Sequence, residues 1–152
     1  MSLFDTLDVS ASGLAAQRRR VEVLAQNIAN AETTRTPEGG PYRRRQIVFE
    51  AVPSSRFADE LEAVRVQPVD GRQEPPSGGV RVAGIELDPA PPQMRYEPEH
   101  PDADANGFVA YPGYDPVRDM VDLSSATRSY QANLAAVNAV RQMIVQTIET
   151  AG

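Results

Sequence analysis

The feature that most constrains this chain is the position of its prolines, because all thirteen lie between residues 37 and 116. Proline interrupts a helix interior, so the two ends are the longest stretches that can form continuous helix. Both ends carry apolar residues at a spacing of seven, which gives a narrow stripe that pairs with another helix. The stripe comprises Leu3, Leu7, Leu14, Val21, Leu24 and Ile28 in the N-terminal arm and Met120, Leu123, Tyr130, Leu134, Val137, Ile144 and Ile148 in the C-terminal arm.

The segment between the arms predicts a small β module with extended loops. Short apolar runs separated by Gly- and Pro-rich turns predict antiparallel strands, and a change of alternation at Gly84 predicts a β-bulge. The expected strands cover residues 42–52, 61–69, 80–87 and 94–97.

We therefore predict an α+β fold in which the terminal helices pair as a coiled coil. The expected organisation is an N-terminal helix in residues 1–34, a loop and β module in 35–114, and a C-terminal helix in 115–152.

Composition excludes several classes of site. The chain has no cysteine and one histidine, which excludes thiolate and histidine-rich metal centres. The formal net charge is −6. Residues 51–115 hold twelve acidic side chains against five arginines, so the arms are near neutral and the middle is acidic. We expect no metal, no cofactor, no small-molecule substrate and no catalytic residues.

Two local patterns suggest binding chemistry but are explained more simply. Residues 102–107 match the first half of a calcium loop, yet Gly113 occupies the position of the essential bidentate glutamate, so we predict an acidic turn. His100 beside it is expected to be a solvated loop residue. The arginine triplets at 18–20 and 43–45 cannot each form one stripe, and the chain is acidic, so we expect no nucleic-acid binding.

Three polar or small residues in the N-terminal arm predict close packing. Gly13 inside a helix costs about 1 kcal/mol relative to alanine and usually marks a kink or a close approach by another backbone. Asn27 and Asn30 lie three residues apart. Two alternatives stay open for them: Asn30 caps the helix C-terminus, or the amides form a polar lock between helices.

Several motifs resemble the bacterial flagellar rod and hook axial protein family. Ser12-Gly13-Leu14 and the run from Ala25 to Thr33 resemble its N-terminal signature, and the segment Ser129-Tyr130-Gln131-Ala132-Asn133 resembles its C-terminal one. Further motifs, at residues 36–44, 100–104 and 107–112, resemble proximal-rod members of that family. After Tyr111-Pro112 the family commonly has Asn-Val, whereas this chain has Gly113-Tyr114-Asp115.

The resemblance implies a structural subunit of the proximal rod of the flagellar basal body. Such subunits polymerise helically with copies of themselves and with other rod proteins, transmit torque and enclose a channel. The resemblance also implies a periplasmic location and passage through the flagellar type III export apparatus.

Export by that route agrees with the start of the chain, which lacks the basic region of a cleaved signal peptide. No stretch has the roughly 18 to 20 apolar residues that insert into a membrane. The alternatives are a cytoplasmic coiled-coil chaperone or regulator, and a small calcium- or nucleic-acid-binding module.

If the chain is a packed subunit, its functional residues are those of helix packing and assembly. We expect these to be Leu7, Gly13, Leu14, Val21, Leu24, Asn27, Ile28, Asn30, Leu123, Tyr130, Asn133, Leu134, Val137, Ile144 and Ile148.

Overall fold

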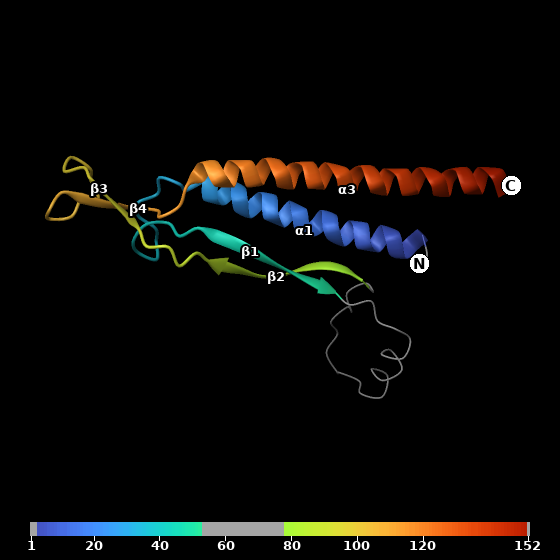
Figure 1. Ribbon diagram of the computed structural model, residues 1–152, viewed down its shortest axis with the longest axis horizontal. Helices are drawn as coiled ribbons and strands as arrows, with labels where there is room; N and C mark the ends of the chain where they lie inside the picture. Colours follow the sequence, from blue (N-terminus) through green and yellow to red (C-terminus); the bar gives the residue numbers. More distant parts are fainter. Residues whose placement is uncertain (1–2, 53–77, 152) are drawn as a thin grey trace, which may run out of the picture. The chain divides into compact units, whose positions relative to one another are not determined.

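The computed structural model describes residues 3–52 and 78–151. In this part of the chain the elements are, in order, α1 (Leu3–Ala29), β1 (Arg45–Val52), β2 (Gly79–Leu87), β3 (Gln93–Tyr96), β4 (Phe108–Tyr111) and α3 (Pro116–Ala151) (Figure 1). Two long terminal helices with small antiparallel sheets between them make the fold α+β, as predicted. The strand expected at residues 61–69 lies outside the described residues.

The strands form two separate two-stranded sheets, β1–β2 and β3–β4. In the second sheet the strands are antiparallel and Tyr96 lies opposite Phe108. The sequence interpretation missed β4, because it followed a proline-rich loop and was taken as part of it. Its sequence, Phe-Val-Ala-Tyr, nevertheless has the aromatic and β-branched character that suits a strand.

The expected bulge at Gly84 stays a prediction. In β2 the half-buried side chains at Val80 and Val82 alternate with exposed ones, and the exposure extends through Ile85 to Leu87. The strand is continuous from Gly79 to Leu87. Ile85 and Leu87 are exposed, with exposed fractions of 39% and 52%.

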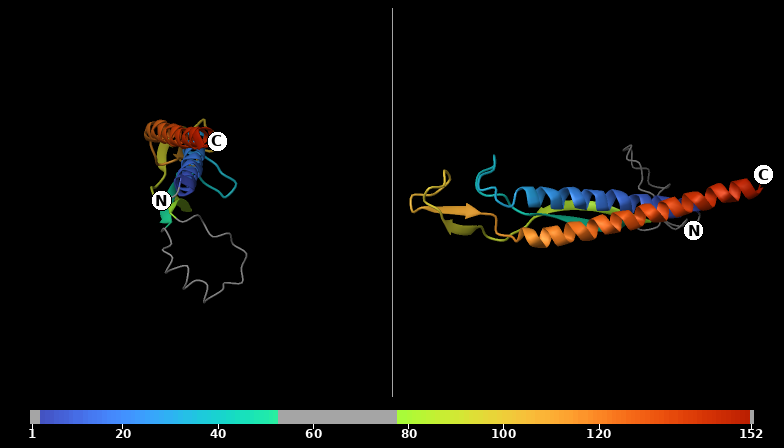
Figure 2. Two further views of the ribbon diagram at one scale, coloured as in Figure 1. Left: turned by 90° about the vertical axis from the view of Figure 1, so that its right-hand side faces the viewer. Right: turned by 90° about the horizontal axis from the view of Figure 1, so that it is seen from above.

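The chain divides into two compact units, each of which contains part of both long helices. In the described residues the first unit comprises 3–17, 49–52, 78–83 and 128–151, and the second unit comprises 18–48 and 84–127. Within the second unit, Figures 1 and 2 show the loop that follows α1 and the β3–β4 ribbon beside each other, beyond the ends of the helices.

In the first unit α1 packs on two sides. The Ser12 hydroxyl accepts a hydrogen bond from the Val80 N–H at 3.1 Å, which ties α1 to the start of β2. At Gly79 an added Cβ would lie 2.4 Å from the Ser12 oxygen, so only glycine permits this approach. The next helix residue, Gly13, faces α3, where an added Cβ would lie 3.1 Å from Asn133 Nδ2. The buried face of α1 is therefore wider than one coiled-coil stripe.

The buried face of α3 has a different second row from the expected one. Leu123, Tyr130, Val137 and Ile144 are half-buried. Met120, Leu134 and Ile148, which were expected to complete the seam, are exposed in the single chain, with exposed fractions of 52%, 42% and 68%. Their contribution to a helix seam stays a prediction. The inward positions beside the first row are Asp119, Ala126, Asn133 and Val140.

Both candidate rows repeat every seven residues, so spacing alone could not separate them. The row that turns inward contains small and polar residues. The exposed row contains the larger apolar ones, which the sequence interpretation placed inside. Pairing of the helices along one continuous seam stays a prediction.

Candidate assembly interface

Asn27 is the centre of a buried hydrogen-bonded cluster in the second unit. Its side chain is fully buried. Nδ2 donates to the backbone carbonyl of Arg45 at 2.9 Å, and Oδ1 accepts from the Arg45 N–H at 3.0 Å and from the Tyr42 hydroxyl at 3.0 Å. Since a buried amide is costly unless its groups are bonded, these partners fix the start of β1 against α1.

Two tyrosines complete this cluster. The Tyr114 hydroxyl donates to the backbone carbonyl of Asn27 at 2.6 Å, and its ring meets that of Tyr42 edge-on at 6.5 Å between centroids. Burial raises the pKa of Tyr42 above its usual value and raises the pKa of Tyr114 to about 12. Both hydroxyls therefore stay protonated and serve as donors at neutral pH.

Asp119, in the first turn of α3, forms a buried ion pair. Its carboxylate is fully buried and accepts from Arg44 Nε at 2.9 Å and from Arg44 Nη2. The hydrogen bonds that Arg44 donates to Asp119 raise the pKa of Arg44 above its usual value. Asp88 and Asp122 lie at 3.8 Å from the same guanidinium. A two-pronged contact of this kind fixes the first turn of α3 to the segment before β1.

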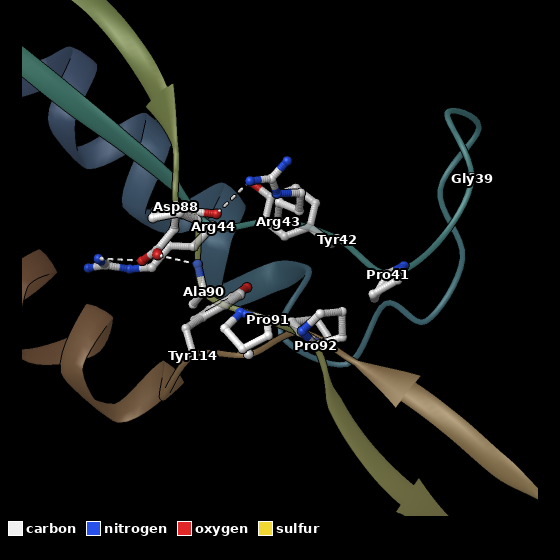
Figure 3. A pocket seen from close by; sticks show the side chains of 13 residues that line it. Gly39, Pro41, Tyr42, Arg43, Arg44, Asp88, Ala90, Pro91, Pro92 and Tyr114 are labelled. Atoms are coloured by element: carbon white, nitrogen blue, oxygen red, sulfur yellow. Dashed lines mark hydrogen bonds and ion pairs between the residues drawn. The ribbon is translucent and has the colours of Figure 1, made fainter.

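A cavity of about 310 Å³ lies beside this cluster (Figure 3). Its walls come from the segments 41–44, 88–92 and 112–114, and Figure 3 shows prolines and tyrosines around it. Asp88 helps to shape one wall: it accepts from the Ala90 N–H at 2.9 Å and from Gln46 at 3.0 Å. The hydrogen bond from the Ala90 N–H and the hydrogen bond from the Gln46 side chain lower the pKa of Asp88.

The segment between α1 and Tyr42 forms a tight turn at residues 36–40. The Gly39 N–H donates to the Thr36 carbonyl at 3.0 Å, and the Thr36 N–H donates to the Gly40 carbonyl at 2.9 Å. Gly39 and Gly40 have φ values of 91° and 76°, which favour glycine. The two glycines thus permit the turn that precedes Tyr42, which packs against α1 through its hydrogen bond to Asn27.

The acidic loop before β4 is held by hydrogen bonds within the chain. Asp104 Oδ1 accepts from the N–H groups of Asn106 and Phe108 at 2.8 and 2.9 Å. Asp102 accepts from the Thr34 hydroxyl at 2.8 Å, and its N–H donates to His100 Nδ1 at 3.1 Å. These side chains form turns and join the loop to the segment after α1. Among the described residues no three His, Cys, Asp or Glu side chains are grouped to hold a metal ion.

The structure separates the two alternatives for the asparagines. The side chain of Asn30 donates to the Gln26 carbonyl at 2.8 Å and caps the C-terminal end of α1. No described non-glycine residue has positive φ, so this cap does not use a left-handed backbone. Asn27 does form a polar lock, but it joins α1 to β1 rather than to the other helix.

Of the other predicted packing residues, Gly13 and Asn133 are brought together in the first unit. Val21, Ile28 and Leu7 are half-buried and Leu24 is buried on α1. The sequence interpretation missed Tyr42, Arg44, Tyr114 and Asp119. One signal was available for Arg44: in an extended segment its side chain points to the opposite side from that of Arg43, and Arg44 is half-buried whereas Arg43 is exposed.

Two residues of the first arginine triplet, Arg18 and Arg19, are exposed on α1, and Arg20 is half-buried. Arg18 and Arg19 both bond to Glu22, at 3.2 and 2.9 Å, and these hydrogen bonds lower the pKa of Glu22. The side chains of Arg18, Arg19 and Glu22 have exposed fractions of 75%, 49% and 41%. Such pairs contribute little to stability. No helix of the described segments is long and apolar enough to cross a membrane.

Known proteins resemble the chain over nearly its whole length. Residues 7–35 match the family described as Flagella basal body rod protein, and residues 105–150 match the Flagellar basal body rod FlgEFG protein C-terminal family. The flagellar basal-body rod protein FlgC of Salmonella typhimurium is 40% identical over 148 residues, 97% of each chain. FlgC of Borreliella burgdorferi is 41% identical over 147 residues, 94% of this chain and 93% of that one.

FlgC of Bacillus subtilis is 38% identical over 153 residues, covering 98% of each chain. The regions aligned with these relatives cover both terminal helices and the segments that contain the Asn27 and Arg44 clusters. The chain belongs to the family of the flagellar basal-body rod protein FlgC.

Proposed function

We propose that the chain is a structural subunit of the proximal rod, which polymerises helically with copies of itself and with other rod proteins. In this function the subunit transmits torque and encloses the export channel. The family supports the structural part of this proposal, since its members are rod proteins. The finer part is supported by the surface of α3.

The observation that carries the proposal is the apolar outer surface of α3. In the second unit its exposed side chains include Val117, Met120 and Val121, and in the first unit Leu134, Met143, Val145 and Ile148. Single exposed apolar residues need no explanation, but here they recur along one helix. A helix that is apolar on more than one side gains stability when neighbouring helices cover it.

The proposed organisation has an inner and an outer part. The inner part would combine the helices of residues 1–34 and 115–152, and the outer part the loops and β module of residues 35–114. The near-neutral helices suit dense packing, whereas the acidic middle suits contact with solvent and with neighbouring subunits.

We further propose that the subunit acts in the periplasmic part of the basal body and passes through the type III export apparatus without signal cleavage. The proposal assigns no catalytic residue, cofactor or substrate. Packing and polar locks are sufficient for a subunit that bears load.

The test compares two neighbouring residues on the exposed surface of α3. Val145→Asn removes an apolar side chain that is exposed in the single chain, and Gln146→Asn is a matched control that stays polar. We expect equal stability of the two isolated subunits but loss of assembly into basal bodies for Val145→Asn alone. Isolated basal bodies are analysed for the subunit. Its absence from basal bodies in cells with the unsubstituted chain would overturn the proposal and favour a chaperone or regulator.

A further inference from the structure

His100 is the only histidine of the chain, and its ring takes part in the structure of the acidic loop before β4. The residue is half-buried. Its Nδ1 accepts a hydrogen bond from the Asp102 N–H at 3.1 Å, and its ring meets that of Tyr111 edge-on at 6.2 Å between centroids. A ring nitrogen that accepts a hydrogen bond carries no proton, so this contact exists only with neutral histidine.

Asp102 connects this ring to the segment that follows α1. Its carboxylate accepts a hydrogen bond from the Thr34 hydroxyl at 2.8 Å, and Arg35 Nη1 lies 3.7 Å from its other oxygen. The N–H of Asp102 is therefore held by the loop, while its carboxylate holds residues 34 and 35. The position of the Asp102 backbone thus determines whether its carboxylate reaches Thr34.

The backbone hydrogen bonds around His100 do not depend on the ring. The His100 N–H donates to the Glu97 carbonyl at 3.1 Å, and the Ala103 N–H donates to the His100 carbonyl at 3.0 Å. A change at the ring nitrogen therefore acts on the Asp102 contact and leaves these two hydrogen bonds in place.

Histidine is the side chain that changes charge between about pH 5 and pH 8. Proton uptake turns Nδ1 from an acceptor into a donor, so the Asp102 N–H loses its partner. The new donor takes an oxygen as its partner, and the Asp102 carboxylate lies in the same turn of the loop. A charged ring therefore competes with Thr34 for that carboxylate.

The other charged groups near the ring come from three segments and have both signs. The Tyr111 ring that contacts His100 bonds through its hydroxyl to Glu97 at 2.9 Å, and Arg95 of β3 lies over the same ring with its Cζ 4.6 Å from the centroid. The full set is Glu97, Glu99, Asp102 and Asp104 in the loop, Arg95 in β3, and Glu32 and Arg35 after α1. Carboxylates favour proton uptake and arginines oppose it. They alter the pH at which the ring becomes charged, but not the loss of the acceptor.

We propose that His100 makes the contact between the acidic loop and the segment after α1 dependent on pH. The neutral ring holds the Asp102 backbone so that its carboxylate bonds to Thr34, and the protonated ring releases this contact. The same surface of the chain then differs between neutral and acidic surroundings. This inference goes beyond the proposed rod function and does not depend on it.

The test is nuclear magnetic resonance of the full-length, isotopically labelled chain from about pH 8 to about pH 5. The single histidine gives one ring signal, which reports its protonation directly. The amide signal of Asp102 and the side-chain signals of Thr34 report the two contacts. The amide of Gly39, which bonds to the Thr36 carbonyl in the neighbouring turn, is the internal control.

We expect the Asp102 and Thr34 signals to move with the same midpoint as the His100 ring, while the Gly39 signal stays in place. Protection of the Asp102 amide against hydrogen exchange, corrected for the intrinsic rate at each pH, should fall about fivefold on protonation, because one hydrogen bond is lost. If the ring titrates while the Asp102 and Thr34 signals stay in place, the proposal is wrong.

Two variants separate the ring from the carboxylates. In His100→Asn the side-chain oxygen accepts from the same N–H but does not titrate, so the contact with Thr34 should persist over the whole pH range. In His100→Phe the ring beside Tyr111 remains but the acceptor is lost, so the contact should be weak at both ends of the range. Shifts between pH 8 and pH 5 that persist in His100→Asn would come from the carboxylates and would overturn the proposal.

Discussion

Asn27 and Arg45 exchange two hydrogen bonds, in which the side-chain amide of α1 pairs with the backbone N–H and C=O of the first residue of β1. The geometry resembles the pairing of two strands, with a side chain in place of one backbone. The strand thus begins against the helix rather than against solvent.

The first prediction concerns this amide. Asn27→Ala leaves the N–H and C=O of Arg45 buried without partners, so we expect the free energy of unfolding to fall by about 2 to 4 kcal/mol. Urea denaturation of the full chain measures the change. The matched control is Gln26→Ala on the exposed side of the same helix turn, which should alter stability by less than about 0.5 kcal/mol. Equal effects of the two substitutions would contradict the assigned role.

The second prediction concerns the buried ion pair. Arg44→Met leaves the Asp119 carboxylate buried and unpaired, which should cost about 3 to 5 kcal/mol. Adding Asp119→Leu should recover much of that loss, because the uncompensated charge is gone. Arg19→Met, which removes one exposed partner of Glu22, should cost less than about 1 kcal/mol. If the double variant is no more stable than Arg44→Met alone, the buried charge does not cause the loss.

The third prediction concerns pH. The pKa of Tyr114 is raised to about 12 in the folded chain, above its value near 10 when unfolded. The folded state therefore holds this proton more tightly. The stabilisation is complete below about pH 10 and is lost as pH rises from 10 to 12. We expect Tyr114→Phe to remove the last step of the tyrosinate absorbance titration and to weaken the alkaline loss of stability. If the titration keeps all its steps, the raised pKa belongs to another tyrosine.

The fourth prediction concerns the approach of Asn133 to Gly13. An alanine Cβ at residue 13 would lie 3.1 Å from Nδ2 at the end of the Asn133 side chain, which can rotate away. We expect Gly13→Ala to change stability by less than about 1 kcal/mol, because its helix propensity offsets the tight contact. Gly13→Leu should destabilise by about 1 to 3 kcal/mol through overpacking. Thermal unfolding measures both, and Gly13→Leu with Asn133→Ala should recover part of the loss. No recovery would indicate that another neighbour limits the space.

The helices and fold class could be predicted from the sequence because their signals are local. The positions of the prolines and the seven-residue spacing of apolar residues predicted α1 and α3 almost to their ends. Pro116 begins α3 as expected. The sequence could not show which residues beside Leu123 turn inward, because Asp119 and Met120 precede it by one helical turn each. The choice between them depends on Arg44, which is 75 residues distant from Asp119 in sequence.

The polar clusters were only partly predictable for a related reason. Asn27 stood out as an amide on an apolar helix, but its partners lie in loops whose course has no periodic pattern. Tyr114 lies at the position where this chain departs from the family motif, and it bonds to the Asn27 carbonyl across 87 residues. Such long-range partners leave no spacing that a single sequence could reveal.

The separation between these partners also determines the order in which the chain can fold. Arg44 meets Asp119, and Asn27 meets Tyr114, only after loops of 75 and 87 residues have closed. Loop closure of this length has an entropic cost that must be met before the contacts stabilise the fold, and such contacts slow folding. A chain that lacks its last 39 residues has neither Tyr114 nor Asp119. The hydrogen-bonded clusters around Asn27 and Arg44 therefore stay incomplete until the C-terminal helix is present.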